Sequence, residues 1–389
     1  MASKECTDSI PLPNLSQEII TVVLLRLPVK SLVKFRCVSK SWLSLISSTR
    51  FAKNHLKISS QKNKGEHDNL VFGYLRDPLV ILRSFNLDSF MHDIRSLDAA
   101  KVNGFVMDII SLLMVGSCNG LICVRDNIHE IFLWNPSIRK SKELPDSGSP
   151  YFLSLTYGFG FDDLNDDYKV VETCGARYKY EYSAEVKIYS LRKNSWRQIE
   201  RWPGYYVSDA TSVFASGAFH WTTIYNGCWH ITSLNLATEM YDEVPLPDNE
   251  INMLTALWLG VLRGCLCLVC NFSTHSDVWI MKGYGIRESW TKLICIKDIK
   301  DYQYEAPMPL YVSESGIVLV KHGSTIKLYN SNDITSNGRE ICSFDSEYEY
   351  EAVTYMESLV LPNTDHEVNQ QWWHWGTKDD DWDFQSICH

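Results

Sequence analysis

The chain has 389 residues, of which 45% are hydrophobic and 22% are charged. This balance is typical of a soluble globular protein and excludes a wholly disordered chain, a collagen and a coiled coil. The formal net charge of −10 argues against a general nucleic-acid binder. No apolar run approaches the roughly 18 residues that a membrane helix needs. The length allows two or three domains.

The N-terminal segment MASKECTDSIPLPN shows neither the apolar core of a secretory signal nor an Arg-rich amphipathic pattern. The 12 cysteines are unevenly spaced in a chain too large to need disulfides for stability. We therefore expect reduced thiols and a cytoplasmic or nuclear location. The aromatic content of 12% favours β structure.

Charge divides the chain into segments. Residues 1–60 carry a net charge of +6, whereas residues 341–389 carry −10, and such asymmetry indicates segments with different partners. The polar run at 61–69 is typical of a linker. We expect a disordered N-terminus (1–10), a helical domain (11–58), a linker with the first strands of a β domain (59–105), the main β domain (106–362) and a poorly ordered, acidic, Trp-containing tail (363–389).

Three helices are predicted in the first of these domains. Asn14 or Ser16 can cap the first, Pro28 breaks the chain after it, and Ser39 can cap the third. After the break, apolar residues repeat at i+3 steps at Leu32, Phe35 and Val38.

The first helix carries two apolar stripes. Ile20, Leu24 and Leu27 share one face, and Ile19 and Val23 lie beside them. A short helix with two stripes must be covered on two sides, so we expect it to contact more than its own chain.

The run LPNLSQEIITVVLLRLPVKSLVKFRCVSKSWLSLISSTRFAKNHL, which begins at Leu12, resembles a plant F-box. F-box domains dock on the Skp adaptor of a cullin–RING ubiquitin ligase. The resemblance implies an adaptor-facing set of Leu12, Pro13, Ile20, Leu24, Leu27, Pro28, Leu32 and Val38. It implies internal packing for Trp42, Leu45 and Ile46.

Two other interpretations of this basic helical unit remain open. One is a helical cap that binds no adaptor. The other is a DNA-binding helix-turn-helix, although the third helix offers Lys40, Ser41 and Ser44 rather than an Arg, Asn or Gln set suited to base edges.

From about residue 110 a strand–turn–strand phrase recurs. Its anchors are Trp134, Tyr189, Leu234, Trp279 and Leu328, at steps of 55, 45, 45 and 49 residues. Repeats of this length, each a four-stranded sheet, are typical of a β-propeller. The predicted fold class is α+β and multidomain, with a small N-terminal helical domain followed by an all-β propeller; an irregular β-sandwich array is the competing architecture.

Several phrases in this region resemble the plant F-box-associated, kelch-like domain. They are GSCNGLIC (116–123), LWNPS (133–137), YGFGFD (157–162), DYKVV (167–171), AEVKIYS (184–190), NSW (194–196) and a closing strand, YMESLV (355–360). S-locus pollen F-box proteins of self-incompatibility and regulators of immune receptors share these phrases. Residues 60–105 and 362–389 match none of them.

Three motifs invite a chemical interpretation. Cys265, Cys267 and Cys270, with His275 nearby, suggest zinc, but they lie in an apolar strand whose alternation sends Cys270 to the opposite face. The segment 116–120 suggests a nucleophile but is not G-x-S-x-G. The aspartates of 162–167 suggest calcium but lack the Gly and Glu of a calcium loop. We expect no catalytic residue, no metal and no cofactor.

The resemblance implies a substrate-receptor subunit of an SCF-type ubiquitin ligase that does no chemistry itself. Its partners would be the Skp adaptor, through it cullin and RING subunits, and a protein target, with no nucleic acid and no membrane. Aromatic loop residues are the candidate target contacts: Trp202, Tyr205, Tyr206, Tyr180 and Trp229. The alternatives are a kelch-oxidase type of propeller enzyme with metal ligands at the central channel and a non-degradative F-box scaffold.

Overall fold

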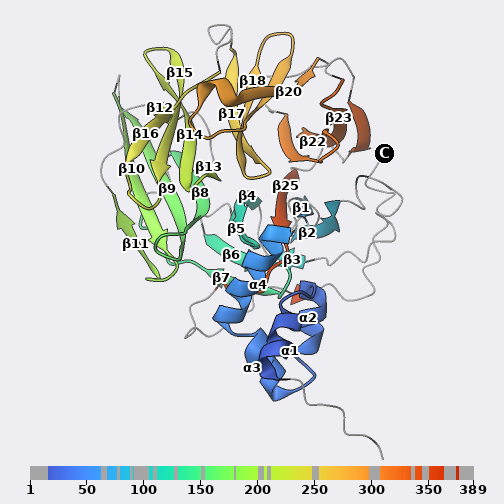
Figure 1. The fold of residues 1–389 in the computed structure, drawn as a ribbon. Helices are drawn as coiled ribbons and strands as arrows, with labels where there is room; N and C mark the ends of the chain where they lie inside the picture. The colour runs from blue at the N-terminus through green and yellow to red at the C-terminus, as the bar shows by residue number, and fades with distance from the viewer. Residues whose placement is uncertain are drawn as a thin grey trace, which may run out of the picture.

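The computed structural model describes residues 16–62, 68–76, 79–87, 91, 105–107, 112–126, 130–149, 154–178, 181–199, 206–207, 212–247, 254–297, 307–333, 338–343, 350–362 and 374–375. Four helices precede a ring of sheets (Figure 1). The helices are α1 (Gln17–Leu24), α2 (Val29–Phe35), α3 (Lys40–Ile46) and α4 (Thr49–Lys62).

Serine side chains begin three of these helices. The Ser16 hydroxyl accepts a hydrogen bond from the Ile19 amide at 3.4 Å, and the Ser39 hydroxyl accepts one from the Trp42 amide at 3.1 Å. Each bond satisfies an amide that has no partner within its helix. Ser48 does the same before α4. The predicted caps at Ser16 and Ser39 are therefore confirmed, and α4 is an additional helix that the helical spacing did not predict.

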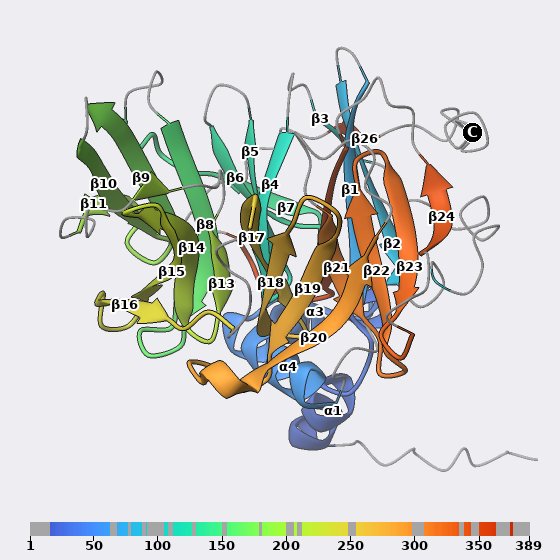
Figure 2. The same cartoon turned by 90° about the horizontal axis from the view of Figure 1, so that it is seen from above.

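The strands form six antiparallel sheets, which are the six blades of a β-propeller (Figure 2). Blade 1 contains β1 (Asp68–Arg76), β2 (Leu79–Asn86), β3 (Phe105–Met107), β25 (Tyr350–Met356) and β26 (His374–Trp375). Blade 2 contains β4 (Leu112–Cys118), β5 (Leu121–Asp126), β6 (Ile131–Asn135) and β7 (Lys140–Glu143). Blade 3 contains β8 (Ser154–Asp162), β9 (Asp167–Tyr178), β10 (Glu181–Ser190) and β11 (Ser195–Gln198).

The other three blades follow the same up-and-down order. Blade 4 contains β12 (Tyr206–Val207), β13 (Val213–Ala215), β14 (Ala218–Tyr225), β15 (Cys228–Asn235) and β16 (Tyr241–Val244). Blade 5 contains β17 (Ala256–Leu262), β18 (Cys265–Asn271), β19 (Ser276–Met281) and β20 (Trp290–Ile296), with a short 3₁₀ turn (Arg287–Ser289) before β20. Blade 6 contains β21 (Met308–Val312), β22 (Ile317–His322), β23 (Thr325–Asn330) and β24 (Arg339–Ser343).

The ring closes because the first blade is built from both ends of the β domain. Strand β25, late in the chain, pairs antiparallel with β1, the first strand. Strands β4, β8, β13, β17, β21 and β25 are each in contact with the next around the ring. Closure covers the two blade faces that an open array would leave exposed at its ends.

The five sequence anchors fall in corresponding strands of successive blades. Trp134, Tyr189, Leu234, Trp279 and Leu328 lie in β6, β10, β15, β19 and β23, the third strand of blades 2 to 6. The predicted propeller is thus confirmed. Blade 1 was not predicted as a repeat, because its strands are split between residues 68–107 and 350–375.

Alternation along the strands builds the core between blades. Val186 and Ile188 of β10 pack with Phe219 and Leu234 of blade 4. Tyr189, on the opposite side of the same strand, packs in the cluster between blades 2 and 3. Each sheet therefore buries both faces against its neighbours, as the repeat pattern predicts.

The turn at Asn119–Gly120 explains one phrase of the family-like pattern. Both residues have positive φ, 53° and 83°, which two-residue hairpins require and glycine tolerates. A Cβ on Gly120 would lie 2.3 Å from the Ser358 hydroxyl oxygen. The turn therefore needs glycine both for its backbone and for the close approach of the segment that follows β25.

The propeller has two faces, and the helices lie on one of them (Figures 1 and 2). The turns after the first strand of each blade, such as β4–β5 and β8–β9, form one face of the propeller. We call it the near face. Asp166, in the β8–β9 turn, forms an ion pair with Lys53 of α4, so the helices lie on this face. Antiparallel strands alternate in direction, so the turns β5–β6, β9–β10, β14–β15 and β18–β19 lie on the opposite face, which we call the far face.

Candidate functional site

One face of α1 is apolar and uncovered. Ile19, Val22 and Val23 are 50%, 51% and 51% exposed. Their i, i+3, i+4 spacing places them side by side on the helix. The other stripe is covered, since Leu24 is only 1% exposed. The sequence predicts that α1 has a second apolar stripe that its own domain does not cover. The exposure of Ile19 and Val23 supports this prediction.

The residues implied to face an adaptor occupy different environments. Leu24 and Leu32 are buried in the helical core, while Ile20 and Leu27 are half-buried against that core. Val38, which lies beyond the end of α2, is 60% exposed, and Pro28 is exposed. Leu12 and Pro13 lie outside the described residues. Val22, the residue that completes the uncovered α1 face, is absent from the set implied by resemblance.

The predicted internal residues of α3 pack as expected. Ile46 is fully buried, and Trp42 and Leu45 pack against the same core. The Trp42 ring meets the Phe35 ring edge to face, with centroids 5.6 Å apart.

His55 of α4 holds the break between α1 and α2. Its Nε2 lies 2.8 Å from the Leu27 carbonyl oxygen, to which it donates. Burial lowers the pKa of this imidazole, although the bond to Leu27 acts in the opposite direction. The neutral ring therefore serves as a structural donor to the backbone between α1 and α2. Because the Leu27 side chain packs against the helical core, substitutions there would disturb the fold as well as any surface.

The helical core continues into the propeller. Leu24, Leu32 and Phe51 share one hydrophobic cluster with Ile138, in blade 2, and Leu359, after β25. Leu56 of α4 packs against the cluster between blades 2 and 3. This continuous apolar packing joins the two domains without a hinge between α4 and the near face.

Two of the five candidate target contacts are described, and both lie near the far face. Tyr206 lies in β12, and Trp229 lies in β15, half-buried against the cluster between blades 4 and 5. Trp202, Tyr205 and Tyr180 lie outside the described residues. The two described residues are close in the sheet, because Tyr206 and Trp229 both pair with Ile224 near the far-face end of β14.

Tyr225, at the same turn as Trp229, is the more exposed ring. It is 48% exposed and meets the His230 ring at a centroid distance of 6.5 Å. Asn226 and Gly227 between them have φ of 49° and 78°, the conformation of a tight hairpin turn. Tyr225 therefore projects from a rigid turn, as an interface anchor would.

The sequence motifs considered for chemistry are structural. Burial raises the pKa of the Cys118 thiol to about 12, so this cysteine is not a ready nucleophile. Cys265 and Cys267 pack between blades 5 and 6, and Cys270 packs toward blade 4, which confirms the predicted alternation. One other group in blade 5, His275 with Asp277 and Cys295, has ligand atoms close enough to hold a metal.

In the aspartate-rich turn of 162–167, Asp162 is satisfied by protein donors. The Asp162 carboxylate accepts hydrogen bonds from the Asn165 side chain at 2.7 Å and from Lys169 Nζ at 2.6 Å. Burial acts to raise the pKa of Asp162, but these hydrogen bonds outweigh it and hold the pKa below its usual value. The aspartate therefore stabilises its own turn and the neighbouring Lys169.

Two protein families match the chain. The F-box domain matches residues 12–54, and the F-box associated beta propeller domain matches residues 74–361. Among the described residues, no helix has the length and apolar character to cross a membrane.

Relatives from Arabidopsis thaliana match over nearly the whole chain. An F-box/kelch-repeat protein is 33% identical over 361 residues, which cover 90% of this chain and 96% of the relative. The F-box protein CPR1 is 30% identical over 385 residues, which cover 90% of this chain and 89% of the relative. The chain therefore belongs to the F-box proteins that carry an F-box associated β-propeller domain.

Proposed function

We propose that this protein is the substrate-recognition subunit of an SCF-type cullin–RING ubiquitin ligase. The single observation that carries the proposal is the uncovered face of α1, at Ile19, Val22 and Val23, in a domain of the F-box family. Neighbouring exposed apolar residues that form one patch, unlike single ones, mark an interaction site. In this family the Skp-type adaptor is the partner that the F-box domain implies.

The far face of the propeller would hold the protein target. Adaptor and target would then bind on opposite sides of a single body, because the helical core and the near face share one hydrophobic cluster. The protein itself would perform no chemical step. It would accelerate ubiquitin transfer by holding the target near the charged ubiquitin carrier, which makes a bimolecular encounter effectively intramolecular.

The proposed location is the cytoplasm or the nucleus. The nine cysteines that the structure describes are free thiols, and Cys123 and Cys267 are fully buried. Buried free cysteines are compatible with a reducing compartment, where ubiquitin ligases of this type act. The outcome of recognition would be ubiquitination and proteasomal degradation of the target.

Adaptor binding is tested by titrating the purified protein with a Skp-type adaptor and measuring the dissociation constant. Val22→Asp and Val23→Asp should each weaken binding by more than about 100-fold, because each would bury an unpaired charge, which costs about 3 kcal/mol or more. Both positions are half exposed in the free protein, so the melting temperature should change little.

Met240→Asp is the matched control. Met240 is also an exposed hydrophobic residue, at 67%, but it lies in the turn between β15 and β16 of the propeller. The proposal predicts wild-type affinity for this variant. Unchanged affinity of the Val22 and Val23 variants would contradict the assignment of the α1 face.

A further inference from the structure

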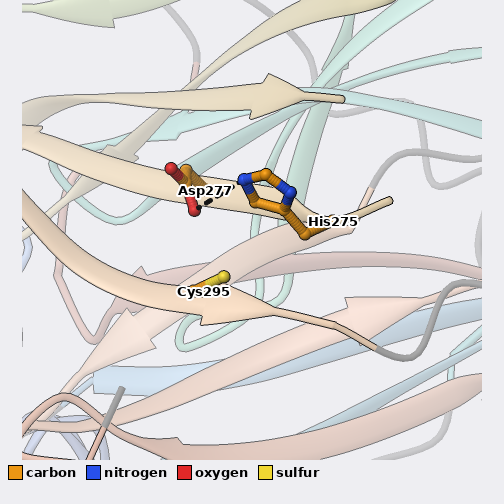
Figure 3. A group of neighbouring side chains, drawn as sticks. All are labelled: His275, Asp277 and Cys295. Atoms are coloured by element: carbon orange, nitrogen blue, oxygen red, sulfur yellow. Dashed lines mark ion pairs between the residues drawn. The ribbon is translucent and has the colours of Figure 1, made fainter. Parts of the chain in front are cut away.

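Three potential metal ligands lie together at the far-face end of blade 5 (Figure 3). His275 lies in the turn between β18 and β19, Asp277 lies in β19, and Cys295 lies in β20. Asp277 and Cys295 are direct cross-strand neighbours. The ligand atoms of the three residues all lie within 4.8 Å of one another.

The Asp277 carboxylate is buried among the side chains of Lys292, His275 and Cys295. Its side chain is only 6% exposed, and its Oδ2 lies 2.5 Å from the Lys292 ammonium group. Among the described residues, Oδ1 makes no hydrogen bond of normal geometry: it lies 3.7 Å from His275 Nε2, and the Cys295 thiol is the other neighbour that can donate to this carboxylate. A thiol is only a weak donor, so a cation placed beside Oδ1 and Nε2 would satisfy this buried oxygen better.

The His275 ring is already oriented for such a role. Its Nδ1 lies 3.0 Å from the Thr274 hydroxyl, and its ring is stacked on Phe272 with a centroid distance of 4.6 Å. These contacts leave Nε2 as the nitrogen that faces Asp277. A second contact on the far nitrogen is the usual way in which a metal-binding histidine is oriented.

We propose that His275, Asp277 and Cys295 form a binding site for Zn²⁺. Imidazole nitrogen, carboxylate oxygen and thiolate sulfur are the three ligand types that zinc takes in proteins, and water would complete a tetrahedral set. The Cys295 thiol gives its proton to solvent when the Zn–S bond forms. His275 is 32% exposed, so an ion can enter from solvent.

Lys292 sets the strength of the site. Its ammonium group holds Oδ2 and leaves Oδ1 for the metal, but its positive charge repels the ion. Zinc affinity should therefore be moderate in the wild-type protein and higher in Lys292→Met. Bound zinc would connect the β18–β19 turn to β20 and so stiffen this part of the far face.

The site is tested by titrating the full-length protein with Co²⁺, which reports thiolate ligation by a charge-transfer absorption band, and by displacing the Co²⁺ with Zn²⁺. The exposed thiols Cys37 and Cys228 are first changed to Ser to remove adventitious binding. The proposal predicts a saturable band from one cobalt ion per chain. Cys295→Ser should abolish the band, and Asp277→Asn and His275→Ala should each weaken binding at least tenfold.

His230→Ala is the matched control. His230 also faces a carboxylate, Glu243, at 2.8 Å, but it belongs to no His–Asp–Cys group among the described residues. This variant should bind cobalt as the wild type does. If Cys295→Ser lowers the melting temperature, loss of cobalt binding in that variant could reflect misfolding. His275→Ala, at a partly exposed turn position, then tests whether the metal is bound at this site. A missing band, or a band that survives Cys295→Ser, would show an ordinary Lys–Asp–His network and overturn the proposal.

Discussion

Asn135 connects blade 2 with the segment that follows the closing strand. Its fully buried side-chain amide donates to the Ser358 carbonyl at 3.1 Å and to the Val360 carbonyl at 2.7 Å. Its oxygen accepts from the Ser137 amide at 2.9 Å. In the sequence, Asn135 stands out only as part of the LWNPS phrase (133–137). The role of Asn135 could not be predicted, because its partners lie more than 220 residues away in the chain.

Asn135→Ala should destabilise the protein by about 3 kcal/mol, because it leaves two buried carbonyl groups without a donor. Urea unfolding measures the change in the free energy of unfolding. Asn235→Ala is the control: Asn235 ends β15 in the same way, but it is exposed and accepts only from amides of its own turn. Its loss should cost about 1 kcal/mol. Equal effects of the two substitutions would refute the special role of Asn135.

His220 is a buried neutral histidine between blades 4 and 5. It is fully buried, and its Nε2 lies 2.8 Å from the Tyr284 hydroxyl. Burial lowers its pKa to about 4, against the opposing effect of backbone hydrogen bonds to Val213 and Ala218. In the unfolded chain the pKa is about 6.5, so the unfolded state takes up a proton first as the pH falls.

His220 therefore lowers stability as the pH falls from about 7 toward 4, and has no such effect above about pH 7. Between pH 8 and pH 5 its contribution should amount to about 2 kcal/mol. Thermal or urea unfolding at both pH values measures this loss, with His220→Gln as the reference that cannot titrate. If the two proteins lose stability equally on acidification, the imidazole is not held neutral by the fold.

Three of the four helices and five of the blades could be predicted from periodicity. Helical spacing indicated both stripes of α1, and the anchor steps indicated blades 2 to 6. Blade 1 could not be predicted in this way, because a repeat search follows contiguous sequence and this blade combines β1 with β25. The His275–Asp277–Cys295 group escaped prediction for a related reason: strand pairing, rather than spacing, brings Cys295 to Asp277.

Strand β25 should be indispensable to the fold, while the segment after Pro362 should not be. Truncation after Ser343 removes β25 and exposes the edge of β1 together with Leu70 and Phe72, which lie in the core next to Tyr350. We expect this chain to lose cooperative unfolding. Truncation after Pro362 removes only β26 among the described strands and should keep the melting temperature within a few degrees.

Circular dichroism melts and limited proteolysis distinguish the two truncated chains. A cooperative melt of the shorter chain would contradict closure of the ring by β25. A collapse of the longer chain would show instead that the acidic tail, expected from its composition to be poorly ordered, contributes to folding.

The whole molecule places two surfaces on opposite sides of one body. The uncovered α1 face belongs to the helical domain on the near face, and Tyr225 projects from the far face. The shared cluster of Leu24, Ile138 and Leu359 joins the two domains. A substitution at one surface should therefore leave binding at the other surface intact. This result would distinguish a receptor with two binding surfaces from a protein that binds all its partners through one surface.

The most direct test is quantitative co-purification of adaptor and ubiquitinated targets with three forms of the protein under proteasome inhibition. Val23→Asp should lose the adaptor and keep its targets in unmodified form. Tyr225→Ser should keep the adaptor and lose part of its targets, since exposed tyrosines are frequent interface anchors. The wild-type protein should recover both. Joint loss of adaptor and targets in either variant, with the fold intact, would contradict two separate surfaces, and retention of the adaptor by Val23→Asp would contradict the proposed function.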